Sequence, residues 1–157
     1  MYSTVRPAAC RFVFRFVCSM IPLKLMRGSL VFVQRCALCH KQGDVGNDIG
    51  PNLQSVAGHT AEKLLVSILD PNASIEPGYA AYTCRLATGE EFYGIIAAET
   101  ANSLVLKGAE GTAHTVLRAE ILSVRGLNLS LMPEGLETDL SKQDMADLIR
   151  YLQQAAR

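Results

Sequence analysis

Two cysteines and a histidine in the run Cys36-Ala37-Leu38-Cys39-His40 are the residues best suited to chemistry. C-x-x-C-H is the attachment signature of c-type haem. Its spacing has a physical basis, because two thiols three residues apart on a helical turn can both add to the vinyl groups on one edge of a porphyrin. The histidine that follows is then placed to bind the iron. The motif predicts one covalent haem c, attached at Cys36 and Cys39, with His40 as the proximal iron ligand.

Two other kinds of site also use paired cysteines. A thioredoxin-like redox pair needs a preceding strand and a βαβ setting, whereas a helical pattern precedes Cys36 and turn-forming residues follow His40. A structural zinc site needs a second pair of ligands at suitable spacing. His59, His114 and Cys84 do not supply one. Both alternatives stay open, and haem is favoured over them.

The loop after the motif is expected to orient His40. Residues 41–58 are rich in Gly, Asp, Asn and Pro, which form turns. A haem-bound histidine donates its other ring N–H to a carbonyl, and this bond fixes the tautomer. Gly50-Pro51 is the expected supplier of that carbonyl, so Pro51 is a predicted cofactor-binding residue. The predicted apolar wall consists of Leu53, Leu64, Ile68 and Leu148.

A methionine on the far side of the iron would give His/Met coordination, which raises the reduction potential and suits electron transfer. Met132 is the predicted ligand, because the loop 129–135 can bring it over the haem while Pro133 stiffens the chain. The alternative is that Met132 only fills the core. The competing candidates, which lie before the attachment helix, in an apolar stripe or beside turns, are Met1, Met20, Met26, Met145, His59 and His114.

Three helices are predicted around this motif. Ser29 can cap a short helix that ends at the cysteines and has Leu30, Val33 and Ala37 on one stripe. Thr60 can cap a second helix over 61–69, which Asp70-Pro71 closes. The third is the closing helix after residue 141, which begins with a capping box over 141–144 and carries an apolar stripe of Met145, Leu148, Ile149 and Leu152.

Between the second and third helices the pattern changes to a period of two, which predicts four or five short antiparallel strands. They are expected at about 82–86, 92–97, 104–106, 115–117 and 121–124. The predicted fold class is α+β: a cytochrome c-like helical fold around haem, with a small antiparallel β-meander inserted at about 79–125. The cytochrome c domain is expected to span 28–157.

Charge is divided unevenly along the chain. Residues 1–35 hold six basic groups and no acidic one, which leaves nine of the 15 basic groups against all 15 acidic groups from Cys36 onward, a net charge of about −6. An acidic body repels phosphate backbones, and no stretch interleaves basic with aromatic residues. Nucleic acid is therefore excluded as an expected partner.

Residues 1–27 form a basic leader with an apolar run that Arg11, Arg15 and Lys24 interrupt. A membrane span needs about 20 mostly apolar residues, so these charges disfavour it. An atypical export signal is the second interpretation, although a clear small-residue cleavage site is missing. We favour a weakly structured leader, and membrane association stays open.

Several motifs together resemble those of one known family. They are Gly28 with Phe32, Cys36 to His40, Gly50-Pro51-Asn52-Leu53, Ile68-Leu69-Asp70-Pro71-Asn72, Tyr79-x-x-Tyr82 and Ser130-Leu131-Met132-Pro133-Glu134-Gly135-Leu136. Over about residues 28–153 the chain resembles the haem-binding domain of planctomycete and verrucomicrobial membrane-bound dehydrogenase-type proteins, a class I cytochrome c variant. The resemblance implies covalent haem c on Cys36 and Cys39, with His40 and Met132 as axial ligands. In that family the domain often ends a longer chain that carries a predicted sugar dehydrogenase, so this chain is expected to be a free-standing cytochrome, a split subunit or a truncated product.

The expected function is one-electron transfer without a catalytic residue. The expected partners are redox proteins, a dehydrogenase as donor and a cytochrome or oxidase as acceptor. The resemblance implies export to the periplasm or beyond, where haem c is attached. One alternative leaves the distal site open, for a peroxidase or a gas or redox sensor. Another makes the β insertion, whose short strands could form a small SH3-like barrel, a binding module for a dehydrogenase subunit or a cell-surface polymer.

Overall fold

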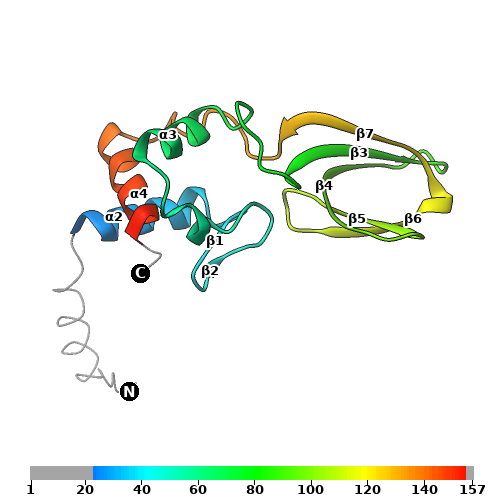
Figure 1. Ribbon diagram of the computed structural model, residues 1–157, viewed down its shortest axis with the longest axis horizontal. Coiled ribbons are helices and arrows are strands. Elements are labelled where there is room, and N and C mark those ends of the chain that lie inside the picture. Colours follow the sequence, from blue (N-terminus) through cyan, green and yellow to red (C-terminus); the bar gives the residue numbers. More distant parts are fainter. Residues whose placement is uncertain (1–22, 155–157) are drawn as a thin grey trace, which may run out of the picture.

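The computed structural model describes residues 23–154 and combines helices at one end with an antiparallel sheet at the other (Figure 1). This confirms the predicted α+β class. The helices are α2 (Leu23–Arg35), α3 (Ala61–Leu69) and α4 (Lys142–Gln154), with a short 3₁₀ helix η1 (Leu53–Val56). Within residues 23–154, none of the helices has the length and apolar character needed to cross a membrane.

Helix α2 differs from its prediction in its start and in its buried face. It begins at Leu23, inside the segment predicted as a leader, and the rest of that leader lies outside the described residues. The predicted cap, Ser29, lies within the helix, where its Oγ donates to the Met26 carbonyl at 2.8 Å. The predicted apolar stripe was wrong, because Leu30 and Val33 are 58% and 54% exposed. The buried residues of α2 are instead Gly28, Val31 and Phe32.

The choice of face follows from the crossing of α2 and α4 at Gly28. A Cβ at Gly28 would lie 2.1 Å from the Asp147 carbonyl oxygen and 2.7 Å from the Tyr151 Cβ, so only glycine permits this approach. One turn further along α2, the fully buried Phe32 ring packs against Tyr151 with its centroid 5.7 Å away. The smallest residue of α2 therefore determines which side of the helix meets α4.

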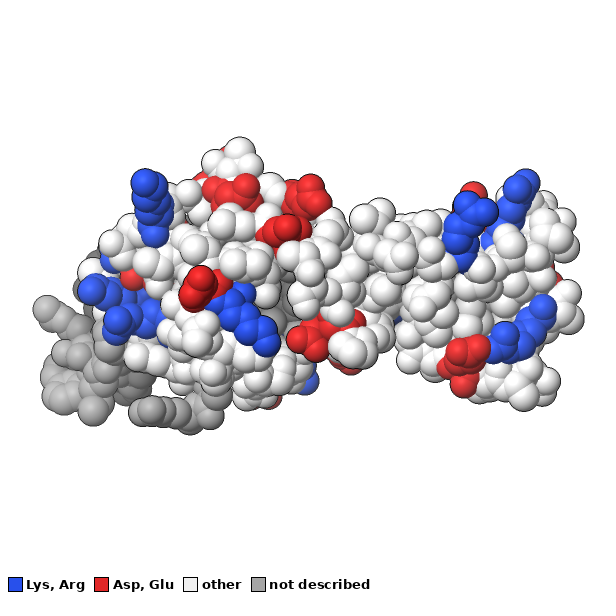
Figure 2. All heavy atoms as spheres, turned by 45° about the horizontal axis from the view of Figure 1, so that its top comes forward, with Lys and Arg blue, Asp and Glu red and all other residues white. Residues whose placement is uncertain are grey.

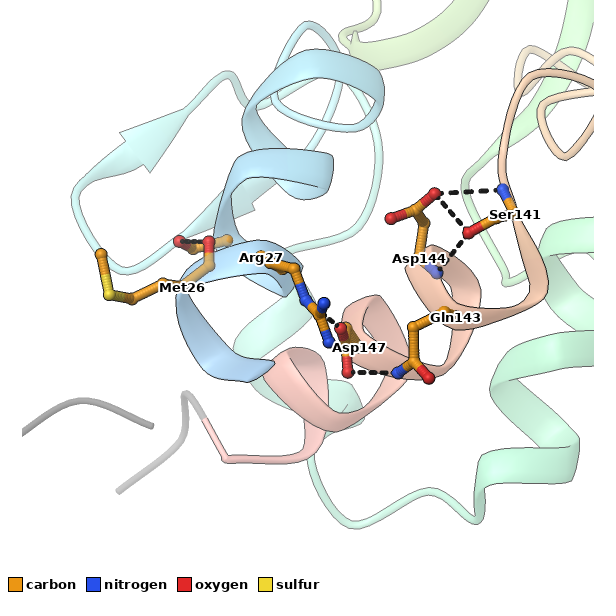
Figure 3. Close-up of polar contacts among 7 residues, drawn as sticks. Met26, Arg27, Ser141, Gln143, Asp144 and Asp147 are labelled. Carbon is orange, nitrogen blue, oxygen red and sulfur yellow. Dashed lines mark hydrogen bonds and ion pairs between the residues drawn. The ribbon is translucent and has the colours of Figure 1, made fainter. Parts of the chain in front are cut away.

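An ion pair joins the same two helices beside the crossing (Figure 3). Arg27 Nε donates to Asp147 Oδ2 at 2.8 Å, and Gln143 Nε2 donates to Asp147 Oδ1 at 2.9 Å. The Asp147 side chain is only 2% exposed, and both of its oxygens are hydrogen-bonded. A buried carboxylate is tolerated when it is paired in this way.

The other two helix starts agree with their predictions. Thr60 Oγ1 accepts a hydrogen bond from the Lys63 N–H at 3.2 Å. At the start of α4, the Asp144 N–H donates to Ser141 Oγ and the Ser141 N–H donates to Asp144 Oδ2, both at 3.1 Å, which is a capping box with Asp in place of Glu (Figure 3). The predicted stripe of α4 is buried with residues of α2 and α3 in one cluster: Val31, Phe32, Leu64, Met145, Leu148, Ile149 and Leu152.

The five predicted strands form one antiparallel sheet. They are β3 (Ala80–Leu86), β4 (Glu91–Glu99), β5 (Ser103–Lys107), β6 (Ala113–Leu117) and β7 (Ile121–Ser130), and their order is β6-β5-β4-β3-β7. Only the first four strands form the predicted meander, because β7 returns to pair with β3. The insertion also extends beyond its predicted end at residue 125, since Ser130 of β7 pairs with Ala80.

The sheet has its own buried cluster, and its β5–β6 turn lies against the loop that follows the motif. Its cluster contains Cys84, Leu86, Leu104, Leu106 and Val116. At the β5–β6 turn, a Cβ on Gly111 would lie 3.5 Å from the side chain of Ile49, in the loop after the C-x-x-C-H motif. Near this turn, Lys107 Nζ donates to the Asp48 carbonyl oxygen. The turn thus rests on the loop that follows the motif.

Replacement of Gly28 tests whether the crossing holds the helical part together. We expect Gly28→Val to lower the free energy of unfolding by about 1–3 kcal/mol, because its side chain would overlap the backbone of α4. Denaturant titration of the full chain measures this. The matched control is Gly58→Ala, since a Cβ at Gly58 has nothing within 4 Å, and we expect it to change stability by less than about 1 kcal/mol. Equal effects of both substitutions would contradict the proposed importance of the crossing.

Candidate functional site

The C-x-x-C-H motif continues the hydrogen bonding of α2. The N–H groups of Cys36 and Ala37 both donate to the Phe32 carbonyl, at 2.8 and 2.9 Å. Those of Cys39 and His40 donate to the Cys36 carbonyl, at 3.1 and 2.8 Å. Both cysteines are free thiols and both are half-buried. The packing of α2 therefore fixes where the motif lies.

His40 is oriented by the loop that was expected to orient it. Its Nδ1 lies 2.7 Å from the Pro51 carbonyl oxygen. Because a carbonyl can only accept, Nδ1 carries the hydrogen and Nε2 keeps its lone pair. The predicted hydrogen bond is thus confirmed. Burial lowers the pKa of His40, and the bond to Pro51 only partly opposes this effect, so the ring is neutral at neutral pH.

Two glycines let the loop pass close to His40. A Cβ on Gly50 would lie 2.6 Å from the His40 Cε1, and a Cβ on Gly46 would lie 2.0 Å from the His40 carbonyl oxygen. Gly46 also has a φ of +95°, which side-chain-bearing residues rarely adopt. It ends a small hairpin of β1 (Lys41–Gln42) and β2 (Val45–Gly46). The loop returns to the motif where the Gly50 N–H donates to the Cys39 carbonyl at 2.7 Å.

A cavity of about 720 Å³ brings most of the predicted site residues together. Its volume falls in the range of roughly 300–1,000 Å³ that is typical of small-molecule sites. The predicted site residues that line it are Cys36, His40, Pro51, Leu53, Leu64, Ile68 and Met132. They come from the end of α2, the loop after it, η1, α3 and the segment after β7, so segments far apart in the sequence form one site.

Two predicted residues lie elsewhere. Leu148 was predicted in the apolar wall, but it is 1% exposed in the cluster between the helices and is not among the residues that line the cavity. Its face of α4 packs on α2 instead. Cys39 does not line the cavity either, because its Sγ lies 3.9 Å from the Ala109 carbonyl oxygen in the β5–β6 turn.

Met132 lies two residues after the end of β7, closer to the sheet in the chain than predicted. Leu129 and Ser130 belong to β7, so the loop begins after the strand and Met132 is near its start. The Met132 N–H donates to Ser130 Oγ at 3.1 Å. Met145 lies in the core, as expected. No local sequence pattern connects this segment with Asn72. The structure shows that Asn72 Oδ1 accepts a hydrogen bond from the Ser130 N–H at 2.8 Å.

The two other histidines in the described residues differ in position. His59 lines the cavity, with its Nε2 3.2 Å from Lys63 Nζ, whereas the sequence indicated a surface or capping residue. His114 lies in β6, and its ring packs against Phe92 with the centroids 4.5 Å apart. The structure therefore places His59, and not His114, beside His40 in the wall of the cavity.

The surroundings of the cysteines do not suit the two alternative sites. In residues 23–154 the motif follows a helix, and the sheet is antiparallel, so the βαβ setting of a redox pair is missing. Burial, and secondarily Cys39, raises the pKa of Cys36 to about 11, whereas redox pairs lower the pKa of the attacking thiol. Among the described side chains, no group of three or more His, Cys, Asp or Glu could hold a metal ion, as a zinc site would require.

No protein family matches the chain, and no curated protein matches it.

Alkylation of Cys36 tests the chemical state of the motif in the full chain with both thiols unmodified. Because the Cys36 pKa is about 11, we expect its reaction rate with iodoacetamide to rise about tenfold per pH unit between pH 7 and 10, in step with the thiolate fraction. Mass spectrometry resolves the modified site. A rate that levels off below pH 8 would instead indicate a redox-active thiol.

Replacement of Gly50 tests the packing against His40. We expect Gly50→Ala to displace the imidazole from the Pro51 carbonyl, because the added Cβ would overlap the ring. Nitrogen-15 NMR of the ring should show one tautomer, protonated at Nδ1, in the unchanged chain and a mixture in the variant. Gly58→Ala is the control and should leave the His40 signals unchanged. A single Nδ1–H tautomer in Gly50→Ala would refute this role for Gly50.

Proposed function

We propose that the protein is a c-type cytochrome that transfers one electron at a time. The observation that carries this proposal is the hydrogen bond from His40 Nδ1 to the Pro51 carbonyl, in a cavity that Cys36 and Met132 also line. That bond leaves Nε2 free to bind a metal. A thiol for attachment, an imidazole and a thioether thus border one space.

The lining of the cavity suits haem in its chemistry, and its volume of about 720 Å³ lies in the range of small-molecule sites. Its wall includes Leu53, Val56, Leu64, Ile68 and Leu152, which give an apolar environment. Burial keeps the His40 imidazole neutral by lowering its pKa, and neutral imidazole is the form that binds iron. These features favour a haem site with a histidine on one side and Met132 as the second ligand.

The chain's own residues would serve four purposes. Cys36 would attach haem c through a thioether, Cys39 would do so once its thiol turns away from the β5–β6 turn, and His40 and Met132 would bind the iron. When bound, haem supplies a reversible one-electron couple. Pro51 holds the ring of His40 in one orientation, and the apolar wall excludes water, so the surroundings need little rearrangement when the charge changes.

The helical part supports a cytochrome c-like fold, with the β-sheet as an insertion between α3 and Met132. The motif follows a helix that crosses the last helix at Gly28, where Phe32 and Tyr151 pack together. Gly28, Phe32 and the motif itself are among the positions on which the resemblance to the planctomycete and verrucomicrobial haem-binding domains depends. We therefore propose membership of that class I cytochrome c variant.

The charge of the molecule suggests how it meets a redox partner. On the face drawn in Figure 2, acidic side chains gather over the helical part and at its junction with the sheet, with basic side chains toward the two ends. From Cys36 onward the net charge is about −6. We propose a partner with a basic docking face, a dehydrogenase as donor and a cytochrome or oxidase as acceptor, whose association weakens with salt. Attachment of haem c places the working protein in the periplasm or another exported location.

Absorption spectra of the chain, co-produced with a cytochrome c maturation system, test the proposal. We expect haem that survives denaturation, low-spin spectra in both oxidation states, and the weak far-red ferric band of a Met–iron bond. Met132→Ala should abolish that band and yield high-spin haem, because the thioether is removed. Met145→Leu is the control: it exchanges a buried methionine for a residue of similar volume and should keep the band.

Other results would change the proposed coordination or overturn the proposed function. High-spin haem in the unchanged chain would favour the open-site alternative, a peroxidase or a sensor. A second outcome is that the unchanged chain gives a low-spin spectrum without the far-red band. If His59→Ala then converts the haem to high spin, the second ligand is His59. Absence of covalent haem under maturation conditions that load a known cytochrome would overturn the proposal.

A further inference from the structure

One side chain, that of Asn72, fastens the chain on both sides of Met132. Its Oδ1 accepts a hydrogen bond from the Ser130 N–H at 2.8 Å. Its Nδ2 donates to Glu134 Oε1 at 2.6 Å. The Met132 N–H in turn donates to Ser130 Oγ at 3.1 Å. Asn72 therefore holds a residue two positions before the methionine and another two positions after it.

The turn that carries Asn72 is itself held by backbone hydrogen bonds at the end of α3. Asn72 follows the end of α3, where the Asp70 N–H donates to the Val66 carbonyl at 2.8 Å. The Ala73 N–H then donates to the Asp70 carbonyl at 3.1 Å, which closes a turn around Asn72. Pro71 in this turn is buried and lines the cavity. We call the two hydrogen bonds of the Asn72 side chain, to Ser130 and Glu134, the Asn72 clamp. The clamp joins the α3 wall of the cavity to the segment that carries Met132.

We propose that Asn72 is a positioning residue that holds the Met132 thioether in place as an iron ligand, an inference that rests on the proposed function. A thioether is a weak ligand on a flexible side chain. Its binding depends on the backbone being held beforehand, because otherwise ordering of the segment would offset the gain from the bond. Ser130 and Met132 both line the cavity, so the clamp acts at its edge.

Asparagine suits this position because it offers an acceptor and a donor at once. Aspartate would still accept from the Ser130 N–H, but it would face the Glu134 carboxylate without a hydrogen to share. The pair Asn72→Asp with Glu134→Gln restores one donor and one acceptor with the roles exchanged. A purely steric role for Asn72 would not respond to this exchange.

Spectra and hydrogen exchange of the full chain test the clamp. In the haem-loaded protein we expect Asn72→Ala and Asn72→Asp each to lose more than half of the far-red Met–iron band at neutral pH, and the double variant Asn72→Asp/Glu134→Gln to regain most of it. In the haem-free protein, Asn72→Ala should exchange the Ser130 amide about tenfold faster. The matched control is Asn102→Ala, an exposed asparagine of the β4–β5 turn, which should change neither measurement.

The possible failures are distinguishable. If the unchanged protein shows the far-red band and Asn72→Ala keeps it, with Ser130 exchange unaltered, the clamp is refuted while the proposed function stands. If the band falls but the exchanged pair fails to restore it, the paired hydrogen bonds are not the cause, and the clamp is overturned in that form. If the unchanged chain takes up no covalent haem, the proposed function fails and the ligand-holding role of Asn72 fails with it.

Discussion

The close approach of α2 and α4 at Gly28 is the constraint on which the site depends. The crossing leaves no space for a side chain at Gly28 of α2. Beside it lie the buried Asp147, which is paired with the half-exposed Arg27, and the packed ring of Phe32. The Phe32 carbonyl also accepts from the N–H groups of Cys36 and Ala37. One residue of α2 thus takes part both in the helix packing and in the turn that carries the cysteines, so the core fixes the origin of the motif.

The position of the motif in turn fixes that of His40, because backbone hydrogen bonds join His40 and the following loop to the motif. The loop returns so closely that it needs glycine at positions 46 and 50, and it presents the Pro51 carbonyl to Nδ1. The imidazole is therefore held by its own turn on one side and by the loop on the other. The helix crossing and this loop together define the orientation of one ring nitrogen, Nε2, which is the atom that we propose binds iron, so that atom is preorganised before any group binds.

Sequence reasoning succeeded where the cause is local and failed where it is tertiary. The Thr60 cap and the capping box at Ser141 join residues three positions apart, and the Pro51 carbonyl lies eleven positions after His40; all three were predicted. The buried face of α2 was missed because its apolar residues allow two faces, and the contact at Gly28 selects one. Asn72 entered only as the last residue of one motif of the resemblance, since its partners Ser130 and Glu134 lie 58 and 62 positions later in the chain and no local pattern indicates them.

The pairing of β7 with β3 explains how a sheet can interrupt the helical part without separating its pieces. In a simple meander, the last strand would leave the sheet at the far edge from the first. Because β7 instead returns beside β3, Ala80 pairs with Ser130 and the insertion enters and leaves at neighbouring points. The side chains of the sheet pack in their own buried cluster, which shares no residue with the cluster between the helices. To the helical part, the insertion therefore acts as a short connection, and the end of α3 can reach the segment of Met132.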